Sequence, residues 1–198
     1  MVKIKRVILF LLAGLMAFIY YISVFDNISD SLVRLHIISN SNTSRDTEIK
    51  LMVRDQILSD MRGYFNRDIK REEVINLIPE IERSANDYLK SQGISYSAQV
   101  IYENTDIPRK EYNEIILPKG EYSAIKVILG DGGGENWWCV AYPPLCFTEE
   151  VFGGMSGKGE KALRDMVGER GFGVITSDIK YELKIVEISK KLFKKITG

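Results

Sequence analysis

The first strongly apolar stretch of the chain runs from Val7 to Phe25 and contains no charged residue. As a helix it would extend about 28 Å, close to the roughly 30 Å hydrocarbon thickness of a bilayer. Basic residues precede it and acidic residues follow it: Lys3, Lys5, Arg6, Asp26 and Asp30. By the positive-inside rule, this order of charges keeps the N-terminus in the cytoplasm and exports the rest of the chain. The pattern predicts a signal-anchor or transmembrane segment over residues 1–28 and one extracytoplasmic domain over residues 29–198.

The length and the end of this segment decide whether it is expected to be retained or cleaved. A secretory hydrophobic core usually has about 7–15 residues and ends in a small-x-small cleavage site. The apolar stretch here is longer, and the candidate site Tyr21-Ile22-Ser23 begins with a bulky side chain. The sequence therefore favours a retained anchor over release by signal-peptide cleavage.

A strand and two helices are expected in the first half of the exported part. Residues 33–38 are β-rich and alternate with a period of two, which predicts a strand. Apolar residues three and four positions apart predict helices over residues 44–63 and 71–91. Pro79 lies inside the second helix and predicts a kink or a restart there, because proline lacks the backbone N–H.

After residue 95 the apolar residues again alternate with a period of two. Four strand candidates follow, at residues 96–102, 112–117, 122–129 and 136–142. Their short links, rich in glycine and proline, indicate an antiparallel meander. A short helix is expected at about residues 158–166, and the end of the chain predicts a strand passing into a C-terminal helix. Helices first and a run of strands afterwards indicate an α+β fold.

Composition narrows the range of functions. The chain has 27 basic and 27 acidic residues, and the first 25 residues hold three of the basic ones and no acidic one. The remainder therefore carries 24 basic and 27 acidic residues, a net charge of −3, which argues against nucleic-acid binding. One histidine and two cysteines are too few for a structural zinc site, which usually takes four such donors. We expect no metal and no small-molecule cofactor.

No catalytic motif is complete. Gly130–Gly134 lies between two strands, whereas a phosphate-binding loop leads into a helix. Ser156 lacks the second glycine of a Gly-x-Ser-x-Gly elbow. His36 and a cysteine could form a nucleophilic pair, but a lone strand histidine is more often structural. The sequence predicts a recognition domain that is not an enzyme.

The two cysteines, Cys139 and Cys146, flank Pro143-Pro144. In an oxidising compartment a turn at the prolines could bring them within bridging distance. Two buried free thiols are the alternative, and the sequence leaves both open.

Both tryptophans of the chain lie in the segment Asn136–Phe147. Strand alternation would send Trp137 and Trp138 to opposite faces, so that one can be core while the other reaches a surface. Exposed aromatic residues beside Pro143-Pro144 are typical of a binding anchor. Two core tryptophans are the alternative reading.

This segment, preceded by glycines at 130, 132 and 134, resembles the stage II sporulation protein R family of endospore-forming bacteria. Residues 34–41, continuing into residues 50–55, are similar to the family's opening block, with Ser39 where alanine is expected. Pro118-x-Gly120-x-Tyr122 is similar too. The resemblance covers nearly all of residues 32–166.

The resemblance implies a signalling protein of the forespore membrane whose domain faces the space between forespore and mother cell. It would activate a membrane-embedded aspartic protease that cleaves the pro-sequence of the mother-cell sigma factor. The alternative is a cell-envelope glycan-binding or hydrolytic domain. The candidate partner-binding residues are Arg34, His36, Asn40, Asn136, Trp137, Trp138, Pro143 and Pro144.

Overall fold

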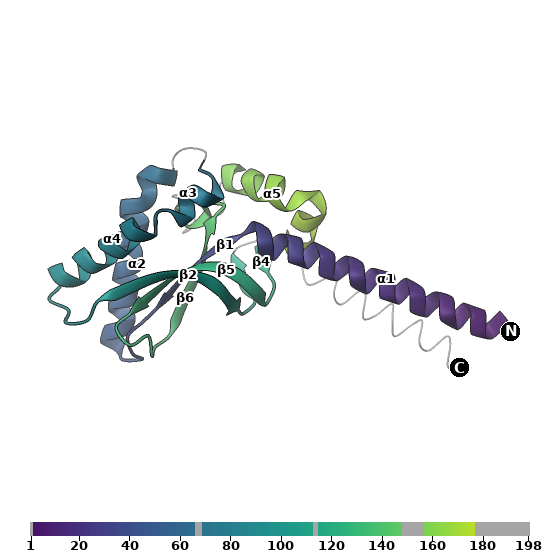
Figure 1. Ribbon diagram of the computed structural model, residues 1–198, viewed down its shortest axis with the longest axis horizontal. Coiled ribbons are helices and arrows are strands. Elements are labelled where there is room, and N and C mark those ends of the chain that lie inside the picture. The colour runs from purple at the N-terminus through teal and green to yellow at the C-terminus, as the bar shows by residue number, and fades with distance from the viewer. Residues whose placement is uncertain (1, 66–68, 113–114, 148–156, 177–198) are drawn as a thin grey trace.

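The computed structural model describes residues 2–65, 69–112, 115–147 and 157–176. The helices are α1 (Val2–Ser31), α2 (Ser44–Phe65), α3 (Arg71–Ile75), α4 (Ile78–Ser91), the 3₁₀ turn η1 (Leu145–Phe147) and α5 (Gly157–Thr176). The strands are β1 (Val33–Ile38), β2 (Ala98–Ile107), β3 (Lys110–Tyr112), β4 (Ile115–Leu117), β5 (Gly120–Leu129) and β6 (Asn136–Tyr142). The chain is α+β, as the sequence predicted (Figure 1).

The main sheet is mixed and has the strand order β2-β5-β1-β6. β1 runs parallel to β5, with Leu35 opposite Ile125, and antiparallel to β6, with Leu35 opposite Cys139. β3 and β4 form a separate two-stranded hairpin. The prediction of an antiparallel meander was therefore wrong, because β1 enters between β5 and β6 and separates strands that are consecutive in the sequence.

The first core lies between the sheet and the helices α2, α3 and α4. It contains Leu35, Ile57 and Ile81, which are fully or almost fully buried. α2 begins where the sequence predicted, since the Asp46 amide donates to Thr43 Oγ1 at 3.2 Å. The helix expected over residues 71–91 is divided into α3 and α4, and Pro79 lies in the first turn of α4. Proline fits there because first-turn N–H groups have no helical acceptor.

A second core forms at the other end of the sheet. The end of α1, the β3–β4 hairpin and α5 bury Ile28, Leu117, Tyr122 and Val140 there. α5 is longer than the predicted helix and has a kink at Gly168, whose φ is 71°. The expected C-terminal strand and helix, beyond residue 176, lie outside the described residues.

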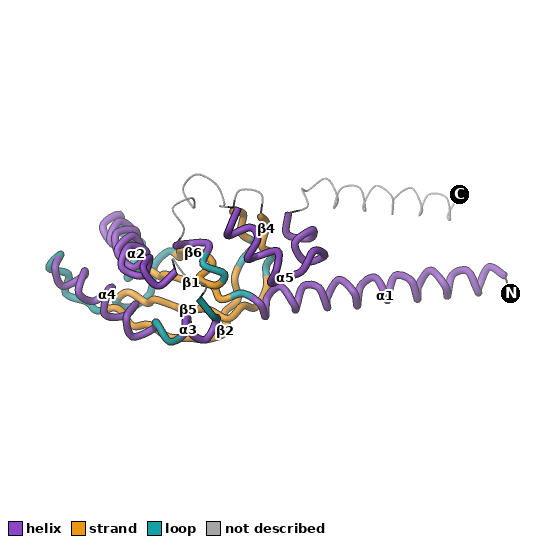
Figure 2. The backbone as a smooth tube through the Cα atoms, turned by 90° about the horizontal axis from the view of Figure 1, so that it is seen from above, coloured by secondary structure: helices purple, strands orange, loops and turns teal. Residues whose placement is uncertain are grey.

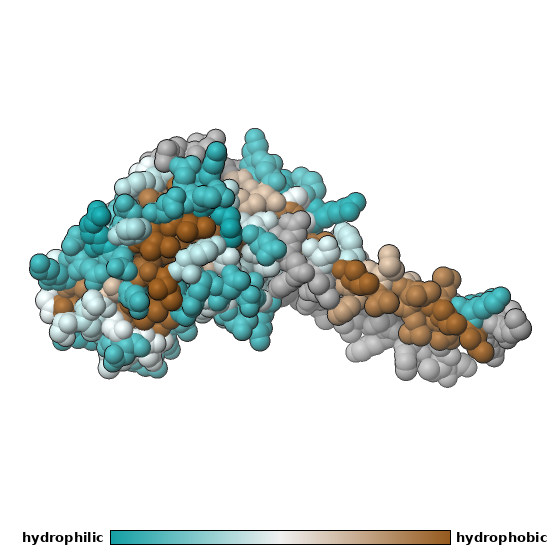
Figure 3. All heavy atoms as spheres, in the orientation of Figure 1, coloured by the Kyte–Doolittle hydropathy of each residue, from teal (hydrophilic) through white to brown (hydrophobic). Residues whose placement is uncertain are grey.

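α1 projects from the folded body as a long helix, and both backbone views show its N-terminal part free of the sheet (Figures 1 and 2). Large apolar side chains from Ile4 to Tyr20 are 50–68% exposed along it, visible as the apolar surface of Figure 3. The sequence predicted a membrane-spanning segment over residues 7–25, which lies within α1. Across the residues described, however, no helix is both long and apolar enough to cross a membrane.

Candidate functional site on the open face of the sheet

The helices of the first core cover only one face of the main sheet. Strand alternation places a second set of side chains on the opposite face. Beyond Arg34, Ala124 and Val140 most of these side chains are exposed or half-buried, and Trp138 packs against the second core. We call this set the open face: Ile101 and Glu103 of β2, Lys126 and Ile128 of β5, His36 and Ile38 of β1, and Asn136 and Trp138 of β6.

Trp138 is the largest side chain of the open face, and it stacks on His36. The two residues are direct cross-strand neighbours on β1 and β6. Their rings stack with centroids 3.5 Å apart and planes 21° from parallel. Trp138 is half-buried, whereas His36 is only 3% exposed beneath it. The indole therefore presents one side to the surface and rests on the imidazole with the other.

Asn136 completes this arrangement. The Nε2 atom of His36 lies 2.6 Å from the Oδ1 atom of Asn136. An amide oxygen only accepts hydrogen bonds, so Nε2 carries the proton of the neutral imidazole. Burial, reinforced by the nearby Lys126 charge, lowers the pKa of His36 to about 4. His36 is therefore neutral at physiological pH and lies beneath the Trp138 ring.

The rest of the open face is apolar with one balanced ion pair. Lys126 lies beside His36 on β5 and donates to Glu103 Oε1 at 2.7 Å. This bond lowers the pKa of Glu103. Ile38, Ile101 and Ile128 are half-buried around it. The open face thus has a half-buried tryptophan, several isoleucines and one paired lysine and glutamate. Such a composition is suited to contact with a protein.

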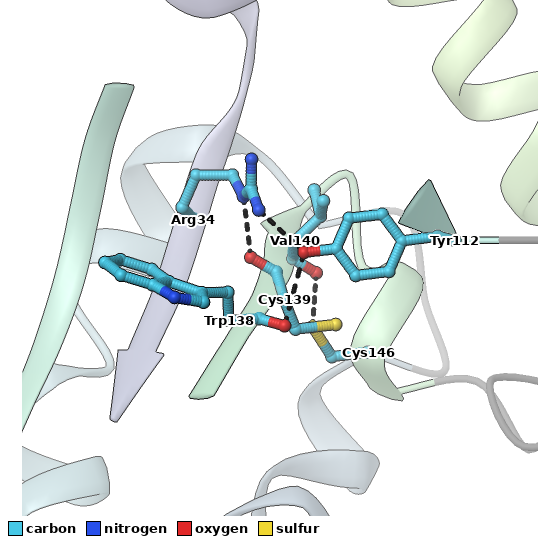
Figure 4. Close-up of a disulfide and its surroundings, with 6 residues drawn as sticks. All are labelled: Arg34, Tyr112, Trp138, Cys139, Val140 and Cys146. Atoms are coloured by element: carbon cyan, nitrogen blue, oxygen red, sulfur yellow. Dashed lines mark hydrogen bonds between the residues drawn. A yellow bond between two sulfur atoms is a disulfide. The ribbon is translucent and has the colours of Figure 1, made fainter. Parts of the chain in front are cut away.

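Arg34 is buried at the edge of this face. It is fully buried, and its Nε donates to the Cys139 carbonyl at 2.9 Å while Nη2 donates to the Tyr112 hydroxyl at 2.6 Å (Figure 4). The guanidinium also lies over the rings of Tyr112 and Tyr122, at 5.6 and 5.1 Å from their centroids. Burial lowers its pKa. Arg34 therefore holds β1, β6 and the hairpin together, and its side chain does not reach the surface.

Cys139 and Cys146 form a disulfide, with Cα atoms 6.0 Å apart. Of the two alternatives, the bridge is the one found. It connects β6 to η1 across the Tyr142–Pro143 cis peptide bond and Pro144. Pro143 is buried and Pro144 half-buried. Because both sulfur atoms are in the bridge, neither cysteine can act as the thiolate of a Cys–His pair.

Asn40 belongs to a polar network beneath the loop Gly130–Gly134, called the glycine loop below. Its Oδ1 accepts the Asp131 amide at 3.0 Å, and its Nδ2 donates to Asp46 Oδ2 at 2.8 Å. Ser41 donates to the same carboxylate, and these bonds lower the pKa of Asp46. Gly134 packs so closely that a Cβ there would lie 2.3 Å from the Ser41 carbonyl. Asn40 therefore joins two loops of the fold, and the glycines serve packing.

Trp137 lies on the other face of the sheet from Trp138. It packs against the first core, and the Arg54 guanidinium lies 5.3 Å from its ring centroid. The predicted opposite orientation of the two tryptophans is confirmed, and both are half-buried. Of the eight candidate contact residues, the structure brings His36, Asn136 and Trp138 together on the open face.

Sequence reasoning did not identify Tyr112, Lys126 or Glu103. Lys126 and Glu103 become neighbours of His36 only when β1 pairs in parallel with β5, which the predicted meander did not include. Among the residues with described side chains, no three His, Cys, Asp or Glu residues are close enough to hold a metal ion. The open face is therefore suited to contact with another molecule, and its one histidine, His36, is neutral.

Comparison with known proteins gives two matches to one family. A family model described as stage II sporulation protein R matches residues 29–151. The chain is 31% identical over 171 residues to the stage II sporulation protein R of Bacillus subtilis (strain 168), covering 74% of this chain and 76% of that protein. No solved structure matches. The matched region contains the whole main sheet and therefore the open face.

Proposed function

Because the chain belongs to the stage II sporulation protein R family, we propose that it is an exported sporulation signal that activates a membrane-embedded aspartic protease. The activated protease would cleave the pro-sequence of the mother-cell sigma factor. In this proposal the chain itself cleaves nothing, and it acts by binding the protease.

The observation that carries the proposal is the open face with Trp138 on its edge strand β6. Trp138 already stacks on His36, so less side-chain freedom is lost when a partner covers it than for an unsupported side chain. Interfaces concentrate their binding energy in a few aromatic residues set among apolar neighbours. We assign Trp138 and Asn136 to the contact with the protease, and His36 and Arg34 to the support of that surface.

Activation requires that the chain prefer one state of the protease. A ligand shifts an equilibrium only by its difference in affinity for the two states. The open face would therefore match a surface that the protease exposes in its active state, including one formed by two protease copies. A tenfold difference in affinity corresponds to about 1.4 kcal/mol, within the range of one well-packed tryptophan.

The proposal places export in α1 and the signalling surface in residues 29–198. The exposed apolar side chains from Ile4 to Tyr20 support this, since such a surface is unfavourable in water. The domain would then act in the space between forespore and mother cell, either tethered through α1 or released from it.

The test is reconstitution in a bacterium that does not sporulate. The cognate protease and its pro-sigma substrate are co-expressed with and without this full chain, and pro-sequence cleavage is followed by gel shift. We expect cleavage only when the chain is present. If a protease that responds to a known activator stays silent with this chain, the proposal is wrong. The domain is then assayed for binding and turnover of purified envelope glycans.

Trp138→Ala and Trp137→Ala form a matched pair for locating the contact. Both substitutions remove a half-buried indole from β6, but from opposite faces of the sheet. We expect Trp138→Ala to abolish cleavage and Trp137→Ala to retain it at equal protein levels. If Trp137→Ala abolishes cleavage and Trp138→Ala retains it, the contact lies instead on the face of the sheet that carries the helices.

A further inference from the structure

The disulfide joins the strand that carries Trp138 to the turn that follows it. The sequence contains two cysteines in all, so neither has a competing partner within the chain. Both are buried, Cys139 at 2% and Cys146 at 4% exposure. Disulfides persist in extracytoplasmic compartments, while the cytoplasm keeps thiols reduced. Under the proposed function, export carries this cysteine pair from the reducing cytoplasm into an extracytoplasmic compartment where a disulfide persists.

β6 depends on this bridge more than the other strands of the main sheet would. Within the described residues it is an edge strand that pairs only with β1, and its register with β1 shifts between Val33 and Arg34. Beyond Tyr142 the chain turns into η1, where Leu145 enters the second core and Cys146 the first. The bridge therefore closes the free end of an edge strand onto a turn anchored in both cores.

The bridge is also coupled to the open face through the backbone. Cys139 directly follows Trp138, and its carbonyl accepts from Arg34 Nε at 2.9 Å. The Trp138 carbonyl accepts from the Tyr112 hydroxyl at 3.2 Å. Figure 4 shows the side chains of Arg34 and Tyr112 converging on this part of β6. A movement of Cys139 is thus transmitted to the residue that stacks on His36.

We infer that oxidation of Cys139 and Cys146 after export switches the signal on. This inference rests on the proposed function and names its regulation. Two thiols lose two protons and two electrons as the sulfur–sulfur bond forms. An exported dithiol–disulfide oxidoreductase in its disulfide form accepts them and leaves as the dithiol. The reduced chain in the compartment where it is made stays inactive, because the end of β6 and Trp138 are not fixed.

The experiment uses the full chain in the reconstituted strain. Cys139→Ala, Cys146→Ala and the double variant are compared with the unmodified chain, and maleimide trapping measures the oxidised fraction. We expect each variant, and the unmodified chain under dithiothreitol, to lose about tenfold or more of the cleavage. Cleavage by the unmodified chain should rise and fall with its oxidised fraction.

Leu89→Ala is the matched control. Leu89 is a buried residue of α4, which packs on α2 and β2 rather than on β6. The substitution Leu89→Ala is expected to lower the free energy of unfolding at least as much as loss of a short disulfide loop does. We expect Leu89→Ala to signal normally at equal protein level, which separates a loss of stability from a loss of the Trp138 surface.

Two outcomes decide directly against the inference. Full cleavage by the double variant overturns it, and so does an active unmodified chain whose cysteines trap as free thiols. If the double variant does not accumulate, the dithiothreitol series on the unmodified chain gives the answer alone. If the oxidised, unmodified chain triggers no cleavage, the proposed function fails and the inference fails with it. An unmodified chain that works while the variants also work leaves the proposed function standing and removes only the redox control.

Discussion

Arg34 and Tyr112 are 78 positions apart in the chain, yet the guanidinium Nη2 donates to the tyrosine hydroxyl at 2.6 Å. The same hydroxyl donates to the Trp138 carbonyl at 3.2 Å. One oxygen atom therefore connects the β3–β4 hairpin to both β1 and β6. Burial raises the pKa of Tyr112, so the hydroxyl keeps its proton and can donate and accept at once.

Tyr112→Phe is expected to lower the free energy of unfolding by about 1–3 kcal/mol, because it leaves a buried guanidinium nitrogen and a carbonyl without this partner. Urea unfolding of the purified chain measures the change. Tyr102→Phe is the control, since the Tyr102 hydroxyl accepts from Arg71 at an exposed position. It should change the stability by less than about 0.5 kcal/mol. Equal effects of the two substitutions would contradict the bridging role of Tyr112.

Gly134→Ala and Gly63→Ala should have opposite effects on stability. A Cβ at Gly134 would overlap the Ser41 carbonyl and the Ser39 hydroxyl, whereas nothing lies within 4 Å of one at Gly63 in α2. We expect Gly134→Ala to destabilise by about 1–3 kcal/mol or more. Gly63→Ala should stabilise by about 0.5–1 kcal/mol, because alanine is the better helix former. Thermal melts of both variants provide the comparison.

The stability should fall in acid partly because of His36. Its pKa is about 4 in the folded chain and about 6.5 when unfolded. Between these values the unfolded state binds more protons, so this contribution is complete above pH 6.5 and is lost as the pH falls to 4. The loss is at most about 3 kcal/mol. His36→Phe keeps a ring beneath Trp138 and cannot titrate.

The difference in unfolding free energy between the unmodified chain and His36→Phe should therefore narrow or reverse as the pH falls from 6.5 to 4. Asp46 titrates in both chains and cancels in this difference, whereas Glu103 cancels except for the smallest part of its pKa shift, which comes from His36. A difference that stays constant over the whole range would show that His36 does not titrate as its surroundings require.

Reduction of the disulfide should lower the free energy of unfolding by about 2–3 kcal/mol, as expected for a short closed loop. Chemical denaturation with and without dithiothreitol measures it. The variant with alanine in place of both Cys139 and Cys146 should have the same free energy of unfolding with and without dithiothreitol, close to that of the reduced unmodified chain. A reductant effect on that variant would indicate damage unrelated to the bridge.

The local elements of this fold could be predicted from the sequence because each has its own hydrophobic period. β1 and β6 have the predicted bounds, and Pro79 divides the second helix as expected. The order of strands could not be predicted in this way. β1 is buried on both faces, which is typical of a central strand, but Arg34 and His36 interrupt its apolar run and concealed that signal.

The candidate site followed the same division. The opposite orientations of Trp137 and Trp138 follow from alternation within one strand and were predicted. The roles of Arg34 and Asn40 depend on which strands and loops meet, so sequence reasoning assigned them to a partner surface. The structure instead places Arg34 under the hairpin and Asn40 against the glycine loop.

The position of β1 in the sheet also sets the order in which the domain can be completed. β1 is made early, but both of its partners, β5 and β6, come from residues 120–142. β1 lacks its neighbour on one side until the chain has been made as far as Leu129, and lacks the other until Tyr142. Contacts this distant in sequence form late. Under the proposed function, a chain that crosses the membrane in extended form would gain this sheet only on the far side.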